Sequence, residues 1–188
     1  MKFTTKKLVI MAVFIALSIA LVFFIHFPIF PAAPYLEYDP ADIPILIGGF
    51  AFGPLAGIMI TIVASAIQAL TVSVAGGPFG FVMHVLATST LVTVSSVIYR
   101  MKHTRLGAVI GLSAGTVAMA LVMVVANHFL TPLFFPSVSA ADIDAGLFVT
   151  VLPFNLIKAG GNSIITFIVY KSVSKYIIHN EKLGGRTN

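Results

Sequence analysis

Lys158 carries an ionisable side chain within a long apolar stretch, about eleven residues into a helix predicted over residues 147–177. An ionisable group at membrane depth costs roughly 2.5–3.5 kcal/mol to insert, so such a lysine marks a functional site by default. The alternative is a lysine whose ammonium snorkels to an interface. Because Lys158 is far from both ends of the predicted helix, its ammonium cannot easily reach an interface. This favours a lysine that binds a ligand.

Two asparagines share a helix face with this lysine. Asn155 stands three positions before Lys158 and Asn162 four after it, which is the spacing of neighbours on one face. The Asn155 amide donates and accepts hydrogen bonds, whereas the Lys158 ammonium only donates. The pair suits a ligand edge that alternates carbonyl oxygens with ring N–H groups. For Asn162 we expect an interhelical hydrogen bond instead.

Further polar candidates stand on two other predicted helices. Asn127 is near the outer end of helix 106–130, where it could line the same cavity. His84 is early in helix 81–99, and a lone buried histidine more often makes a packing hydrogen bond than binds a ligand. No acid or second histidine stands at a suitable spacing, so a metal site has little support.

Catalytic motifs are absent from the sequence. It has no cysteine, no phosphate-binding G-x-x-x-x-G-K-[ST], no H-E-x-x-H and no G-x-S-x-G. No intramembrane acid stands ready to pair with Lys158 as a proton relay. We therefore expect a protein that is not an enzyme and needs no cofactor.

The composition identifies the environment of these groups. Of 188 residues, 59% are hydrophobic and 9% are charged, with a mean hydropathy of +1.06. A soluble domain has roughly a quarter charged residues, so only a lipid bilayer accommodates this surface. The excess of 11 basic over 6 acidic residues could indicate nucleic-acid binding, but the positions of the charges argue against it. We predict an all-α integral membrane protein.

Charge distribution predicts the orientation. All basic residues except Lys158 form three clusters, and five of the six acids lie between these clusters. The basic clusters are Lys2, Lys6 and Lys7; Arg100, Lys102 and Arg105; and Lys171, Lys175, Lys182 and Arg186. The acids are Glu37, Asp39 and Asp42, then Asp142 and Asp144. The positive-inside rule places all three basic clusters, and therefore both termini, in the cytoplasm.

An even number of crossings must then separate the clusters, which predicts six transmembrane helices. Their expected ranges are 8–26, a short second helix at 42–52, 55–73, 81–99, 106–130 and 147–177, with an outer loop at 131–146. Gly53 and Pro54 mark the break after the short helix. We expect residues 1–179 to form one membrane domain and residues 180–188 a disordered cytoplasmic tail.

The first outer loop, residues 27–42, is rich in proline and aromatic residues. Tyr35 and Tyr38 present flat apolar faces with polar tips. The loop is either an interfacial aromatic belt or a lid over an outward-opening pocket. Asp42 suits an N-cap of the short second helix.

Small residues recur at four-residue spacing in two helices. The stripes are Ala12, Ala16 and Ala20 in the first helix, and Gly107, Gly111 and Gly115 in the fifth. Such stripes permit close helix contact in membranes. They usually pack within the protein, whereas a stripe that faces outward would dock another membrane subunit.

Two motifs carry a family resemblance. The run from Tyr38-Asp39-Pro40-Ala41-Asp42 to Phe52-Gly53-Pro54-Leu55-Ala56-Gly57 resembles the signature of substrate-binding S components of energy-coupling factor (ECF) vitamin transporters. The later Pro153-Phe154-Asn155-Leu156-Ile157-Lys158 is similar to the motif of the riboflavin-specific S component.

The resemblance implies a vitamin-binding subunit of an ATP-driven importer in a bacterial-type cell membrane. Its partners would be a transmembrane coupling subunit, docked on Ala12, Ala16 and Ala20, and two ABC-type ATPases. Riboflavin would be the transported ligand, captured from outside under the first loop. The ligand-binding positions would be Asn155, Lys158, Asn127, Tyr35, Leu36 and Glu37, to which we add His84.

Several alternatives stay open. Ser65-Ala66 and Gly80-Phe81 stand where riboflavin binders often have a Lys-Asn pair and an Asn, so FMN, folate or pantothenate could be the ligand. A small channel or scaffold would explain the helices and the small-residue stripes. It would not explain a buried Lys158 beside Asn155 under a proline-rich loop.

Overall fold

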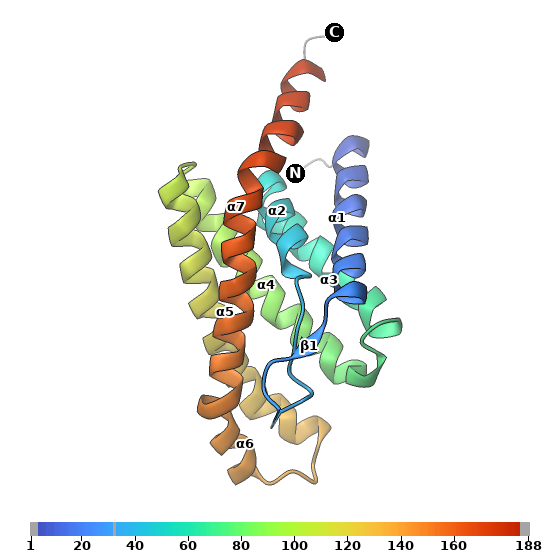
Figure 1. Cartoon of the computed structure of the whole chain (residues 1–188), viewed down its shortest axis with the longest axis vertical. Coiled ribbons are helices and arrows are strands. Elements are labelled where there is room, and N and C mark those ends of the chain that lie inside the picture. The colour runs from blue at the N-terminus through green and yellow to red at the C-terminus, as the bar shows by residue number, and fades with distance from the viewer. Residues whose placement is uncertain (1–3, 32, 185–188) are drawn as a thin grey trace.

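The protein is described here by a computed structural model, which covers residues 4–31 and 33–184, with side chains described as far as Tyr170. Its helices are α1 (Thr5–Phe24), α2 (Asp42–Phe52), α3 (Pro54–Leu70), α4 (Gly77–Met101), α5 (Arg105–Phe134), α6 (Ala140–Gly146) and α7 (Leu152–Gly184). The helices α1, α5 and α7 run roughly along the long axis of the molecule, whereas α3 and α4 cross it obliquely (Figure 1). The 3-10 turn η1 (Val74–Gly76) precedes α4, and a π-helical segment, η2 (Leu147–Val151), precedes α7.

Four helical stretches in the described part of the chain are long and apolar enough to cross a membrane. They are Thr5–Phe24, Val74–Met101, Arg105–Phe134 and Ala140–Tyr170. The apolar helices α2 and α3 are shorter. These helices agree with the prediction of an all-α membrane protein. Six crossings and cytoplasmic termini stay predictions.

The short helix α2 has the predicted bounds, and its burial explains how it can be short. With 11 residues it is about 16 Å long, half the thickness of a bilayer core. All its residues except Ala51 are buried, and it packs against α1, α3, α4 and α7. Because protein surrounds α2, lipid does not meet its ends.

Glycines permit the turn and the close packing around α2. Gly53 has φ +98°, a conformation that favours glycine, and Pro54 follows as the first residue of α3. A Cβ on Gly49 would collide with Val92 Cγ2 and lie 2.5 Å from Ser96 Oγ, so the α2 backbone approaches α4 closely.

The two small-residue stripes face different surroundings. A Cβ on Gly111 would lie 2.7 Å from the backbone oxygen of Ser95, so the glycine stripe of α5 packs inside the protein against α4. In α1 the buried face is Met11, Phe14, Ser18 and Val22, while Ala12, Ala16 and Ala20 are all exposed. The alanine stripe therefore faces outward.

The two segments predicted to be outer loops hold more structure than expected. β1 (Phe27–Pro28) pairs antiparallel with β2 (Glu37–Tyr38), and Phe27 lies opposite Tyr38. The predicted loop 131–146 is wrong in part: α5 continues to Phe134, and α6 occupies Ala140–Gly146. Ser139 caps α6 by accepting a hydrogen bond from the Asp142 backbone N–H.

The two ends of the bundle differ in charge. Figure 1 shows the start of α1, the α4–α5 turn and the C-terminal part of α7 at one end, and the β1–β2 hairpin and α6 at the other. The described members of the three basic clusters thus lie toward the first end, as the predicted topology requires, whereas Lys2 and Arg186 lie outside the described residues. The helix α7 is described to Gly184, so residues 180–184 are helical where we expected a tail. Residues 185–188 lie outside the described residues.

Candidate functional site

An ion pair between α7 and the first outer loop is the centre of the site. Lys158 Nζ donates a hydrogen bond to Asp39 Oδ2 at 2.5 Å, and Lys158 is only 8% exposed. Asp39 follows β2 directly, so a loop carboxylate reaches the ammonium. The sequence offered no acid within the membrane helices to pair with Lys158, and the partner comes from the loop instead.

Two further hydrogen bonds fasten the loop to the same face of α7. Asn162 Nδ2 donates to the backbone oxygen of Asp39 at 3.0 Å, and Tyr38 Oη donates to Asn162 Oδ1 at 2.9 Å. The Tyr38 ring also packs near Gly161 and against Phe27. The prediction that Asn162 bonds other segments is confirmed. We call this loop, described at residues 27–31 and 33–41, the lid, because its hydrogen bonds to α7 hold it over Lys158.

Asp42 lies beneath this lid and binds neighbouring helices. It is fully buried, accepting hydrogen bonds from Thr88 Oγ1 at 2.6 Å and from Asn162 Nδ2 at 2.9 Å. The prediction that Asp42 caps α2 is wrong: Ala41 occupies the N-cap position, and no side chain bonds the cap. Its carboxylate instead joins α2 to α4 and α7, and an acid at the start of a helix suits the helix dipole.

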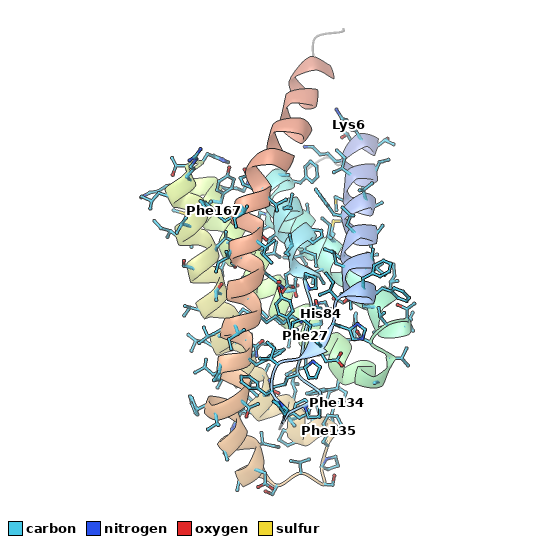
Figure 2. The ribbon with its side chains drawn as sticks, viewed as in Figure 1. Lys6, Phe27, His84, Phe134, Phe135 and Phe167 are labelled. Atoms are coloured by element: carbon cyan, nitrogen blue, oxygen red, sulfur yellow. The ribbon has the colours of Figure 1, made fainter. Side chains whose placement is uncertain are left out.

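His84 joins the same buried polar cluster from α4. Its Nδ1 lies 3.1 Å from Ser65 Oγ, and its Nε2 lies 3.9 Å from Asp42 Oδ1. His84 Nε2 is buried and has no hydrogen-bond partner among the residues that the structure describes, and the same holds for Nε2 of the α3 residue Gln68. Figure 2 labels His84 close to Phe27 of the β1–β2 hairpin. The hydrogen bond between His84 Nδ1 and Ser65 joins α4 to α3, whereas Nε2 can still form a hydrogen bond with a ligand.

Asn155 lies one helical turn from Lys158 and beside an irregular stretch of backbone. It is 3% exposed, and its Nδ2 donates to the Val151 oxygen at 2.8 Å. Val151 ends η2, and Pro153 follows it near the start of α7. Wide π turns are frequent at functional sites, because they shift the side chains that follow them. Here the turn sets the position of Asn155.

The remaining candidate residues surround this centre less closely. Asn127 Nδ2 donates to its own helix at the Met123 oxygen, and no hydrogen bond among the described side chains joins it to Asn155 or Lys158. Tyr35 is 76% exposed, and Glu37 is exposed in β2. Leu36 is half-buried. The structure thus brings together Lys158, Asn155 and His84 with the loop, but does not bond the other candidates to them.

The charges of the loop are set by this environment. Burial alone would raise the pKa of Asp39, but the Lys158 ammonium and the hydrogen bonds from Lys158 and the Ala41 backbone N–H hold that pKa below its ordinary value. Burial and the Asp39 carboxylate raise the pKa of Tyr38, so its phenol stays neutral and can donate to Asn162. At neutral pH the lid is therefore held by a charged pair and a neutral phenol.

Asp39 is the main residue of the site that the sequence did not assign. The signal was present, because Asp39 lies in the Tyr38-Asp39-Pro40-Ala41-Asp42 run. Its partner stands 119 positions away, and no local pattern reports such a contact.

The arrangement suits reversible binding of a polar ligand edge. It offers the buried ammonium and the buried amide of α7 together with the partly buried imidazole of α4. Within the described residues, no group of three or more His, Cys, Asp or Glu side chains could hold a metal ion.

Comparison with known proteins gives consistent matches. The family described as "ECF transporter, substrate-specific component" matches residues 6–170. The protein named "Riboflavin transporter RibU" of Staphylococcus aureus (strain TCH60) is 32% identical over 177 residues, which cover 92% of each chain. "Riboflavin transporter FmnP" of Bacillus subtilis (strain 168) is 27% identical and is matched over 92% of this chain and 94% of that one.

A solved structure matches over almost the same extent. It is described as "Structure and mechanism of the S component of a bacterial ECF transporter", with a TM-score of 0.78 and 29% identity. The match covers 92% of this chain and 97% of that one. Family, relatives and fold agree with each other and with the motifs on α2 and α7. The chain belongs to the family of substrate-specific components of ECF transporters and, as such a component, is not an enzyme.

Proposed function

We propose that this protein captures riboflavin from outside the cell and presents it to an ATP-driven ECF import complex. The observation that carries the proposal is the buried Lys158 ammonium, held under the first outer loop one turn from Asn155. Two riboflavin transporters related over 92% of this chain support the choice of ligand.

Flavin chemistry fits the groups at the site. The uracil-like edge of riboflavin alternates carbonyl oxygens with ring nitrogen, and Lys158 and Asn155 supply donors and an acceptor. Both already have protein partners, Asp39 and the Val151 oxygen. A flavin must therefore displace these partners or share the donors with them. We infer that Asp39 leaves Lys158, at least in part, when riboflavin enters, which couples ligand entry to opening of the lid.

The outward alanine stripe supports a docked membrane partner. Because Ala12, Ala16 and Ala20 are exposed, another helix can approach the α1 backbone closely there. We assign this surface to the transmembrane coupling subunit, which two ABC-type ATPases would drive. In this arrangement six helices cross the cell membrane, both termini are cytoplasmic, and the β1–β2 hairpin faces outward.

Flavin fluorescence tests this function. Detergent-purified protein is titrated into riboflavin, with FMN, folate and pantothenate as competitors. Saturable quenching that folate and pantothenate leave unchanged supports the proposal. No quenching would rule riboflavin out, and displacement by folate or pantothenate at equal concentration would reassign the ligand.

A further inference from the structure

A cavity lies at the end of the bundle opposite the Lys158 site. Its volume is about 400 Å³, and it is formed by the α4–α5 turn and α7. The lining residues are Tyr99, His103, Thr104, Arg105, Ala108, Phe167, Ile168 and Tyr170. Figure 2 labels Phe167 at this end of the molecule, far from His84. Along α7 the cavity begins nine residues after Lys158, or about 14 Å at the rise of an α-helix.

The base of the cavity is built from aromatic rings. Tyr99 stacks on Phe50 of α2 at a centroid distance of 4.6 Å, and Tyr170 meets Phe50 edge-on at 5.1 Å. The Tyr99 and Tyr170 hydroxyls form a hydrogen bond with each other. This contact ties α7 to α4 beneath the cavity. Two phenol oxygens thus lie at the base, while the rings keep the rest of it apolar.

The rim of the cavity is positively charged, and no acidic residue is among the described residues that line it. Arg105 and His103 supply nitrogen donors there, and the exposed Lys102 stands close by in the same turn. No carboxylate lines the cavity, and no ion pair neutralises Arg105 among the side chains that the structure describes. Arg100, in contrast, lies against Gly53 at the α2–α3 turn. Within the described part of the chain, Arg105 is therefore a guanidinium without a carboxylate partner beside a largely apolar cavity.

The cavity also reaches the apolar outer surface. Ile168 lines it and is 68% exposed, and Leu106, next to Arg105, is exposed to a similar degree. A ligand that fills both regions needs an anionic head and an apolar body. Guanidinium groups bind phosphate with two parallel hydrogen bonds, and basic pockets between membrane helices are typical sites for anionic headgroups.

We propose that this cavity binds an anionic phospholipid, with its phosphate at Arg105 and an acyl chain along Ile168. The site follows from the membrane embedding and from the proposed cytoplasmic position of this end, and it goes beyond riboflavin capture. A lipid bound there would bridge the α4–α5 turn and α7. A soluble phosphate ester shares the head chemistry but has nothing to cover Ile168 and Leu106, which is why we assign the site to a lipid.

Native mass spectrometry of delipidated protein in neutral detergent tests the site. Phosphatidylglycerol and phosphatidylcholine with identical acyl chains are added to wild type, Arg105→Gln and Lys102→Gln. Lys102→Gln is the matched control, because it removes one positive charge from the same turn without changing the lining. We expect wild type and Lys102→Gln to retain phosphatidylglycerol at least fivefold better than phosphatidylcholine, and Arg105→Gln to lose this preference.

Three results would overturn the proposal. Equal retention of the two lipids by wild type would show that the cavity does not select an anionic headgroup. Equal loss of the preference for phosphatidylglycerol in both variants would indicate unspecific charge attraction. Displacement of phosphatidylglycerol by glycerol 3-phosphate at equal concentration would reassign the cavity to a soluble ester. Riboflavin quenching on the same samples reports folding at the opposite end, so a misfolded variant is recognised independently of lipid binding.

Discussion

Lys158 Nζ and Asp39 Oδ2 lie 2.5 Å apart, although their residues are 119 positions apart in the sequence. The ammonium that the family resemblance assigns to the ligand is the same group that holds the outer loop closed. Ligand binding and loop closure therefore compete for one cation. Separating the two roles needs variants that remove the ligand contact without leaving a buried charge unpaired.

Lys158→Met should abolish riboflavin binding and also lower stability, because it leaves the Asp39 carboxylate unpaired. Removing one partner of a buried ion pair costs about 3–5 kcal/mol, and Asp39, at 14% side-chain exposure, should lie at the lower end. The double variant Lys158→Met/Asp39→Asn removes the unpaired charge. In the double variant, thermal unfolding in detergent should show that stability recovers. Fluorescence quenching should show that riboflavin binding does not recover. Recovery of riboflavin binding would disprove a direct role for Lys158.

Asn155→Ala should weaken riboflavin binding by at least fivefold, or about 1 kcal/mol, as expected for a lost buried hydrogen bond. Its hydrogen bond to the Val151 oxygen lies within its own helix, so the fold should tolerate the loss. Ser163→Ala is the control, because it removes a buried hydroxyl that lies on the same helix as Asn155 and is hydrogen-bonded to Thr116 of α5. Titration by fluorescence quenching compares the two variants. Equal weakening by both would indicate a general effect on α7 and not a ligand contact.

The pH dependence of the lid follows from the lowered pKa of Asp39. A carboxyl whose pKa is lower in the folded protein contributes stability above its unfolded pKa, about 3.9, and loses it as the pH falls through the folded value. The difference in unfolding temperature between wild type and Asp39→Asn should thus be constant from about pH 5 to 8. It should shrink below about pH 4. A difference that already vanishes near pH 6 would show that Asp39 is not held ionised by Lys158.

Local signals in the sequence were sufficient for some elements. The Gly53-Pro54 pair ended α2 at the predicted residue, since glycine at positive φ and proline at a first helical position both have local causes. Lys158 was recognisable because an ionisable group in an apolar helix is costly wherever its partner lies. The helix α6 had its own signal, a Ser139 cap followed by Asp142, which the sequence analysis did not use.

Long-range contacts were not available from local signals. Asp42 looked like a helix cap because it starts α2, yet its oxygens bond Thr88 and Asn162 on other helices. The Lys158–Asp39 pair depends in the same way on how the loop folds back over α7. Which small-residue stripe faces outward also depends on packing, because the spacing of Ala12, Ala16 and Ala20 is the same as that of the buried glycines in α5.

Gly49→Ala should destabilise the bundle by about 1–3 kcal/mol, the usual cost of overpacking a dense interior. Its new methyl group would collide with Val92 Cγ2 and Ser96 Oγ, which α4 holds in place. Gly80→Ala is the matched control, because a Cβ there meets no atom within 4 Å. Thermal unfolding in detergent measures both variants. An equal effect of the two substitutions would contradict the close approach of α2 to α4.

Ala16→Phe should block assembly with the coupling subunit while leaving riboflavin binding unchanged. Ala16 is exposed at the centre of the α1 stripe, so a phenyl ring there alters no internal contact but keeps another helix from approaching the backbone. Val117→Phe is the control, because it adds a phenyl ring at an exposed position of α5, away from the alanine stripe. Co-purification with the coupling subunit, beside fluorescence quenching by each variant, measures both properties. If Ala16→Phe assembled as well as Val117→Phe, the outward stripe would not be the docking surface, and the partner would have to bind another face of the bundle.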